Sequence, residues 1–174
     1  MKSVRILAAA TLLLAQAACD QDPTTTKAPS APAPVAQGIQ AFVQVDNDHA
    51  KPGDAVHVFV KVQLGTELQA KVGSYTGLLA FDTTSLTFKA ETKINDGLRV
   101  TNPGFGPGKI KFAGVAATGL ADLTLYDGTF EVKKADYREK LVLQMEELSA
   151  ALSMGNLKPQ LQVTPQIFLR SAAR

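Results

Sequence analysis

Side chains able to do catalysis or hold a metal are few in this chain. Its 174 residues include one cysteine, two histidines and no tryptophan. A single cysteine excludes an intramolecular disulfide and a cysteine-based zinc site. Neither His49 nor His57 has a second ligand at a metal-binding spacing, and His57 alternates with valines on the polar side of a predicted strand. We therefore expect both histidines to be solvated, and no metal or other cofactor to bind.

One group of acidic residues offers an alternative. Asp46-Asn47-Asp48, with Asp54 nearby, supplies the oxygen ligands that Ca²⁺ prefers. The spacing lacks the further acids and the fixed glycine of an EF-hand loop. Surface acids of turns are the preferred interpretation, and a calcium site is the alternative.

A glycine-rich run, Gly104-Phe105-Gly106-Pro107-Gly108-Lys109, partly matches a phosphate-binding loop. A P-loop has four residues before Gly-Lys, followed by Ser or Thr, whereas here three intervene and Ile110 follows. The run therefore predicts a hairpin connection. An exposed aromatic residue at its tip would be a contact residue, so we select Phe105, with Tyr75 and Tyr126, as candidate binding residues.

Catalytic constellations are missing from the sequence. It has no Gly-x-Ser-x-Gly elbow, and its acids are scattered over predicted turns without a pair suited to glycoside hydrolysis. We predict that the protein is not an enzyme.

The first 18 residues read as a secretory signal. Lys2 and Arg5 precede an apolar run over residues 6–15, which is shorter than the roughly 20 residues that span a bilayer. The following Ala17-Ala18-Cys19 resembles the lipobox of bacterial lipoproteins, in which the cysteine is diacylated and N-acylated, although Gln16 departs from the usual Leu or Val. The resemblance implies a membrane anchor at Cys19 and a place in the bacterial cell envelope, facing the periplasm or the exterior. The alternative is simple secretion.

The net positive charge of the chain comes from this leader. The whole chain has 18 Lys+Arg and 16 Asp+Glu, and removal of residues 1–18 takes away Lys2 and Arg5, which leaves 16 of each sign. A neutral domain lacks the basic stripe that binding to phosphates requires, so we exclude nucleic acid as a partner.

Residues 19–38 are rich in Pro, Thr and Ala and contain Val35 as their one large apolar residue. Such a stretch cannot bury enough surface to offset its ordering entropy. We expect a disordered tether that reaches on the order of 50 Å.

From residue 39 the hydrophobic period becomes two, which is typical of strands. Val56, Val58, Val60 and Val62 share one face of a predicted strand. Similar runs occur at 41–45, 78–81, 86–89, 98–101, 109–115, 128–133 and 161–169, separated by turn signals at 51–54, 95–97, 102–104 and 126–128. Eight or nine short strands predict an all-β sandwich.

Residues 137–153 fit two patterns. Leu141, Met145, Leu148 and Leu152 have helical spacing, yet Leu141, Leu143 and Met145 also alternate. Periodicity alone favours a helix by a small margin.

Three blocks together resemble the cohesin domain, a nine-stranded jelly-roll sandwich related to certain carbohydrate-binding modules. The blocks are 50–56, with a Lys-Pro-Gly-Asp turn, 75–88, with an aromatic-Asp turn at Phe81-Asp82, and 109–119 with 128–133. Within them, Asp82 is suited to accept hydrogen bonds from backbone N–H groups, and Gly77 permits close approach of another group. The resemblance also implies a strand at 140–147, with a helical turn in 148–154.

We therefore divide the chain into a signal peptide (1–18), a tether (19–38) and a cohesin-like domain (39–174). The resemblance implies a binding module with a protein partner, either dockerin-like or an envelope component. Polysaccharide binding is the alternative, and without tryptophan it would depend on Phe, Tyr and polar groups.

Overall fold

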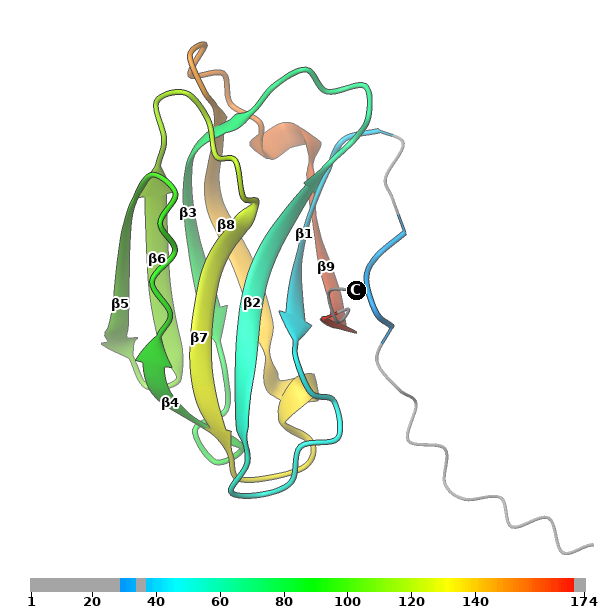
Figure 1. The fold of residues 1–174 in the computed structure, drawn as a ribbon, viewed down its shortest axis with the longest axis vertical. Helices are drawn as coiled ribbons and strands as arrows, with labels where there is room; N and C mark the ends of the chain where they lie inside the picture. Colours follow the sequence, from blue (N-terminus) through cyan, green and yellow to red (C-terminus); the bar gives the residue numbers. More distant parts are fainter. Residues whose placement is uncertain (1–28, 34–36, 171–174) are drawn as a thin grey trace, which may run out of the picture.

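A computed structural model describes residues 29–33 and 37–170, which form two β-sheets packed face to face (Figure 1). The nine strands are β1 (Ile39–Val45), β2 (Ala55–Leu64), β3 (Val72–Ala80), β4 (Leu86–Glu91), β5 (Leu98–Gly106), β6 (Lys109–Val115), β7 (Thr124–Val132), β8 (Val142–Ala150) and β9 (Leu161–Leu169). Two short 3₁₀ helices, η1 (Tyr137–Lys140) and η2 (Lys158–Gln160), precede β8 and β9. The predicted all-β sandwich is confirmed.

Strand order shows how the chain crosses between the layers. One sheet has five strands in the order β4-β7-β2-β1-β9, and the other has four in the order β5-β6-β3-β8. The first and last strands pair in parallel, and the other strand pairs are antiparallel. Figure 1 shows β1 and β9 side by side at one edge.

The core lies between the sheets and follows the two-residue alternation. Val56, Val58, Val60 and Val62 of β2 are all buried on the inner face, as predicted. Full burial of an aliphatic side chain of this size contributes about 1.5–3 kcal/mol.

Two predicted details of the β3–β4 region are confirmed. A side chain at Gly77 would place its Cβ 2.7 Å from Cε2 of Phe112, so the glycine makes room for that ring. In the next turn the Asp82 carboxylate accepts a hydrogen bond from Thr84 N–H at 2.7 Å, and this bond lowers the pKa of Asp82.

Two predicted turns lie inside strands instead. Residues 126–128 belong to the middle of β7, where Gly128 leaves space for the Tyr126 ring, and residues 102–104 belong to β5. In both places the pairing with neighbouring strands outweighs the local preference of Asp, Asn, Pro and Gly for turns.

The ambiguous segment is the strand β8, so the helix favoured by periodicity is wrong and the strand implied by the resemblance is confirmed. Thr76 pairs with Glu147 while the next residue, Gly77, pairs with Met145, so Glu146 is an extra residue in a β-bulge. Because of the bulge, the buried residues Met145 and Leu148 are three positions apart instead of two, and this spacing resembles that of a helix. The expected helical turn in 148–154 is also wrong, because β8 continues to Ala150.

The signal peptide and Cys19 lie outside the described residues. Part of the predicted tether does not: residues 29–33 lie against the domain, where the Pro29 carbonyl accepts a hydrogen bond from Leu169 N–H. The segment has too little apolar surface to fold by itself, but it is ordered here because it packs against the apolar surface of the adjacent sheet. Within the described ranges no helix has the length and apolar character needed to cross a bilayer.

Candidate functional site

The outer face of the four-stranded sheet carries the side chains that point away from the core. Because strand side chains alternate, the pairing registers set these residues in rows across the sheet. We call this surface the β5-β6-β3-β8 face. Its members are Leu98, Val100 and Asn102 of β5, Lys111, Ala113 and Val115 of β6, Ser74, Thr76 and Leu78 of β3, and Gln144, Glu147 and Ser149 of β8.

Over β5 and β6 this face is apolar. Leu98 is 73% exposed and Val100 68%, and Val115, directly opposite Leu98, is 46% exposed. A shallow hollow of about 330 Å³ lies among them and extends to Thr76 and Glu147. Of the eight large hydrophobic side chains exposed in the described chain, five belong to strands of this sheet. Such clustering is typical of an interaction surface.

Over β8 the face is polar, and its charged groups are held in place. The Glu147 carboxylate accepts hydrogen bonds from the hydroxyls of Ser74 at 2.9 Å and Ser149 at 3.3 Å. Lys111 Nζ lies 2.9 Å from the Glu146 carboxylate. The face therefore combines an apolar patch with a fixed polar border, which is the usual anatomy of a protein interface.

The β5–β6 hairpin adds an aromatic side chain at one end of this face. The pairing is interrupted between Asn102 and Gly106, and the intervening residues bulge outward. Phe105 is 48% exposed there, with Lys111 Nζ 5.1 Å from its ring centroid. Gly108, at φ +62°, makes the turn, so the predicted hairpin connection is confirmed.

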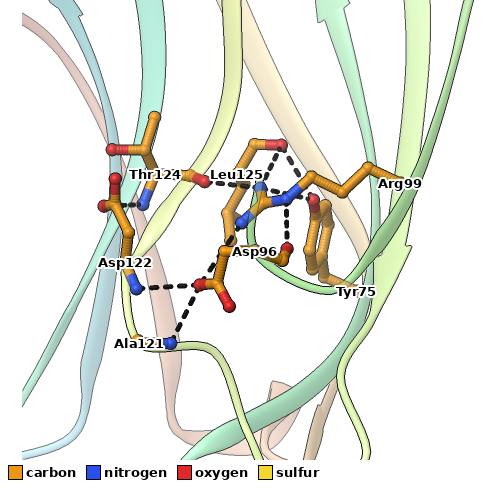
Figure 2. A network of polar contacts seen from close by, with 7 residues as sticks. All are labelled: Tyr75, Asp96, Arg99, Ala121, Asp122, Thr124 and Leu125. Atoms are coloured by element: carbon orange, nitrogen blue, oxygen red, sulfur yellow. Dashed lines mark hydrogen bonds and ion pairs between the residues drawn. The ribbon is translucent and has the colours of Figure 1, made fainter. Parts of the chain in front are cut away.

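Arg99 fixes β5 to the rest of the sandwich (Figure 2). Its side chain is 9% exposed and points inward, away from the apolar patch. Its Nη1 donates hydrogen bonds to the Tyr75 hydroxyl at 2.9 Å and to the Thr124 carbonyl at 2.6 Å, and its Nε donates to the Asp96 carbonyl at 2.7 Å. One guanidinium group thereby joins β5 to β3 and β7.

Asp96 completes this network on the loop side (Figure 2). Its carboxylate accepts hydrogen bonds from the backbone N–H groups of Ala121 and Asp122, both at 2.9 Å, and lies 3.7 Å from Arg99 Nη2. The pair is charged and largely enclosed, and both residues make several hydrogen bonds to backbone groups, which stabilises such a pair. Arg99 Nη2, which faces the carboxylate, makes the ion pair but no hydrogen bond. The Arg99–Asp96 pair thus adds attachments to β5, an edge strand whose one strand neighbour is β6.

The structure places Tyr75 and Tyr126 in the core, each 1% exposed, so the prediction that they contact a ligand is wrong. The Tyr75 hydroxyl donates to the Leu125 carbonyl at 2.9 Å, and the Tyr126 ring stacks on Phe112 at 5.6 Å. Burial raises the pKa of Tyr75, with Arg99 acting in the opposite direction, and burial also raises the pKa of Tyr126. Phe105 remains a predicted contact residue.

Two residues expected in solvent have specific partners. His57 Nδ1 lies 3.0 Å from the Asp127 carboxylate on the neighbouring strand, and the His57 side chain is 39% exposed, so it is solvated as predicted but also has a specific partner. Asp48 is 7% exposed and lies 3.9 Å from Arg138 and 3.6 Å from the exposed His49, so it is not a surface acid. In both cases a charged group from a distant part of the chain supplies the partner.

The other two acids of the calcium alternative are turn acids, as predicted. Asp46 accepts a hydrogen bond from His57 N–H at 2.9 Å, and Asp54 accepts one from Lys51 N–H at 2.8 Å. In residues 29–33 and 37–170, no three His, Cys, Asp or Glu side chains are placed to hold one metal ion.

Sequence reasoning missed Arg99, Asp96 and the apolar patch. The available signal was an arginine between two aliphatic residues of a strand, Leu98 and Val100, preceded by an Asp-Gly turn. Alternation means that such an arginine and its neighbours face opposite ways, but the pattern does not say which side is the core.

No family model matches the chain, and no curated protein matches its sequence. Solved structures do match. A non-cellulosomal cohesin from the archaeon Archaeoglobus fulgidus has a TM-score of 0.52 at 19% identity, covering 74% of this chain and 86% of that one. The second type II cohesin module of the ScaA scaffoldin of Acetivibrio cellulolyticus has a TM-score of 0.54 at 13% identity, covering 80% and 100%. This chain has the cohesin fold.

This chain also matches a chain of the Coh-OlpC–Doc435 cohesin–dockerin complex of Clostridium thermocellum. The TM-score is 0.54 at 15% identity, and the match covers 77% of this chain and 94% of that one. At these identities the fold is what is shared, and the predicted nine-stranded cohesin-like sandwich is confirmed. The blocks that resemble cohesins form the β1–β2 turn, the β3–β4 region and strands β6 and β7. These blocks contribute strands to both sheets of the sandwich.

Proposed function

We propose that this protein is a non-catalytic binding module of the bacterial cell envelope. Lipidated Cys19 holds it at a membrane, and the β5-β6-β3-β8 face receives a protein partner. The observation that carries the proposal is the exposed patch formed by Leu98 and Val100 on β5, the strand that Arg99 fixes from behind, and by Val115 on the adjacent β6.

A flat, rigid patch suits a folded partner. Leu98 and Val100 lie on a strand and lose little conformational entropy on binding, since β-branched and strand-held side chains have few rotamers. The partner would place its own apolar side chains over the patch, with Glu147 and Lys111 at the polar border.

Solved complexes support a proposal for the type of partner. Solved proteins with this fold include cohesins in complex with dockerins, from Clostridium acetobutylicum and Clostridium thermocellum. A dockerin-like domain or another envelope protein is therefore the partner we propose for this chain.

Polysaccharide binding is less favoured. Sugar-binding platforms need exposed aromatic faces, and Tyr75 and Tyr126 are in the core. Phe105 is the one aromatic residue among the exposed large hydrophobic side chains of the described chain.

Comparing two pairs of substitutions tests the proposal. The full chain, immobilised as bait, is exposed to native envelope extract, and the retained proteins are quantified by mass spectrometry. Leu98→Ser with Val100→Ser should lower retention of a specific protein by roughly thirtyfold, the effect of about 2 kcal/mol at an interface hot spot. The matched control, Leu152→Ser with Met154→Ser, removes two exposed apolar side chains from the β8–β9 connection and should leave retention unchanged.

The proposal fails if no specific protein is retained, or if both pairs reduce retention equally. Retardation in polysaccharide-containing gels that Phe105→Ala abolishes would establish the alternative.

A further inference from the structure

Three phenylalanines lie on the outer face of the five-stranded sheet and yet are buried. Phe42 of β1, Phe59 of β2 and Phe168 of β9 are 5%, 3% and 4% exposed. Their neighbours in the strands, such as Val43 and Val60, face the core, and the three rings lie outside the core cluster. The opposite sheet therefore does not cover them.

The rings form one aromatic surface around Gln44. In the pairing register Gln44 lies between Phe59 and Phe168, and Phe42 contacts Phe168 edge to face at 5.4 Å. The guanidinium of Arg170 lies 4.5 Å from the Phe59 ring centroid. We call Phe42, Phe59 and Phe168 with Gln44 the aromatic surface.

Residues 29–33 lie against this surface. Leu169 N–H, on the edge of β9 that has no strand neighbour, donates to the Pro29 carbonyl at 2.6 Å, and Gln44 Nε2 donates to the Ser30 carbonyl at 3.4 Å. Pro29 and Pro32 are half-buried, whereas residues 30, 31 and 33 are exposed. The prolines therefore face the protein, and they provide apolar rings without a backbone N–H that would need a partner.

The segment runs opposite to β9. Pro29 is bonded beside Leu169, while Gly38 lies beside Gln160 at the other end of the strand (Figure 1). The nine residues of β9 span about 30 Å. Pro29 and Gly38 therefore lie at opposite ends of β9.

We propose that the aromatic surface is a docking site for an extended, proline-containing peptide, and that residues 29–33 of the same chain occupy it. Docking moves the point at which the tether leaves the domain from the Gly38 end to the Arg170 end. It also covers the open edge of β9, which Pro165 only partly protects. This inference does not rest on the function proposed for the opposite sheet.

Hydrogen exchange of the full chain tests the docking. Pro29→Gly with Pro32→Gly removes the two half-buried rings, and Ala31→Gly with Ala33→Gly adds the same number of glycines at exposed positions. The first pair should speed exchange of the Leu169 amide by about fivefold or more, and the second by less than about twofold. Unchanged exchange of the Val60 amide shows that the sandwich stays intact.

Equal exchange of Leu169 in both variants would overturn the proposal. So would protection of Leu169 that disappears on dilution, because a second copy of the chain would then supply the segment.

A nitroxide on Cys19, the single cysteine, tests the exit point in protein made without acylation. A random coil of ten residues, the separation of Cys19 and Pro29 in the sequence, extends about 17 Å. Docking predicts paramagnetic broadening of Asn47 and its neighbours, which adjoin the Arg170 end. Broadening centred on Gly155, near the other end, would overturn it.

Discussion

Arg99 joins three elements with one side chain. Its loss would leave the Thr124 carbonyl without its charged donor and the Asp96 carboxylate without its cationic partner, in a largely enclosed site. We expect Arg99→Ala to lower the free energy of unfolding by about 3 kcal/mol, since one partner of a buried pair is then uncompensated. Urea denaturation followed by circular dichroism measures this.

Lysine at the same position separates charge from shape. Arg99→Lys keeps the charge but cannot donate in several directions, so it should recover less than half of the loss. Lys93→Ala removes an exposed cation nearby and should change stability by less than about 0.5 kcal/mol. Equal stability of the Arg99→Ala and Lys93→Ala proteins would contradict the structural role of Arg99.

All three tyrosines of the chain are buried, and this has a consequence at high pH. Burial raises the pKa of Tyr137 to about 12, and it raises those of Tyr75 and Tyr126. An unfolded tyrosine loses its proton near pH 10, so above that pH the unfolded chain binds fewer protons than the folded chain, and stability falls as pH rises from about 10 to 12.

Tyrosinate absorbance should therefore appear together with unfolding in an alkaline titration. The same chain in concentrated urea, where tyrosines are exposed, should titrate near pH 10. Tyrosinate formation near pH 10 with native circular dichroism would show that the hydroxyls reach solvent.

At the residue scale, prediction from the sequence succeeded where the partner is local. The Asp82 and Asp54 carboxylates bond backbone groups two or three residues away, so turn chemistry reveals them. His57 and Arg99 bond residues 70 and 25 positions distant, and no local pattern contains that information.

In strand β8, the single extra residue Glu146 interrupts the alternation by which a strand is recognised in the sequence. Deletion of Glu146 would place Glu147 directly after Met145 and restore an uninterrupted alternation opposite β3. We expect this deletion to fold and to lose less than about 1 kcal/mol, the value of its exposed ion pair with Lys111. Thermal or urea unfolding measures the change.

Deletion of Gln144 is the matched control. It would bring Glu146 to the core-facing position of Met145, which costs several kcal/mol unless the glutamate is neutralised. If both deletions are equally harmful, the bulge is not the site of the extra residue.

At the element scale, regular alternation made β2 and the first half of β5 predictable, whereas bulges concealed the second half of β5 and the strand β8. The patch on β5 was hidden for a related reason. Leu98 and Val100 have the composition of core residues, and only the burial of Arg99 on the other side shows that they face outward.

For the whole molecule, we propose that lipidation of Cys19 determines where the protein resides. Cys19→Ala should release the protein from the membrane fraction, because two or three long acyl chains, at about 0.8 kcal/mol per buried methylene, are then missing. Fractionation of cells followed by immunoblotting measures the partition. Unchanged membrane association would refute lipidation as the anchor, and Ser30→Ala, which leaves the cysteine intact, is the control.

The cohesin fold as a whole was predictable because its blocks are structural: turns, alternating strands and the glycine that admits Phe112. The contact between the tether and the aromatic surface was not. Residues 29–33 contain no large apolar side chain apart from proline, and the phenylalanines of the aromatic surface come from strands at both ends of the chain.

The parallel pairing of β1 with β9 makes the order of synthesis matter. Ile39 cannot pair with Leu161 until β9 has been synthesised, so the five-stranded sheet is completed late in synthesis. Until then, the outer edge of β1 has unpaired backbone groups that another strand can join. The nine-residue strand β9 therefore removes a site of wrong pairing when it completes the sheet.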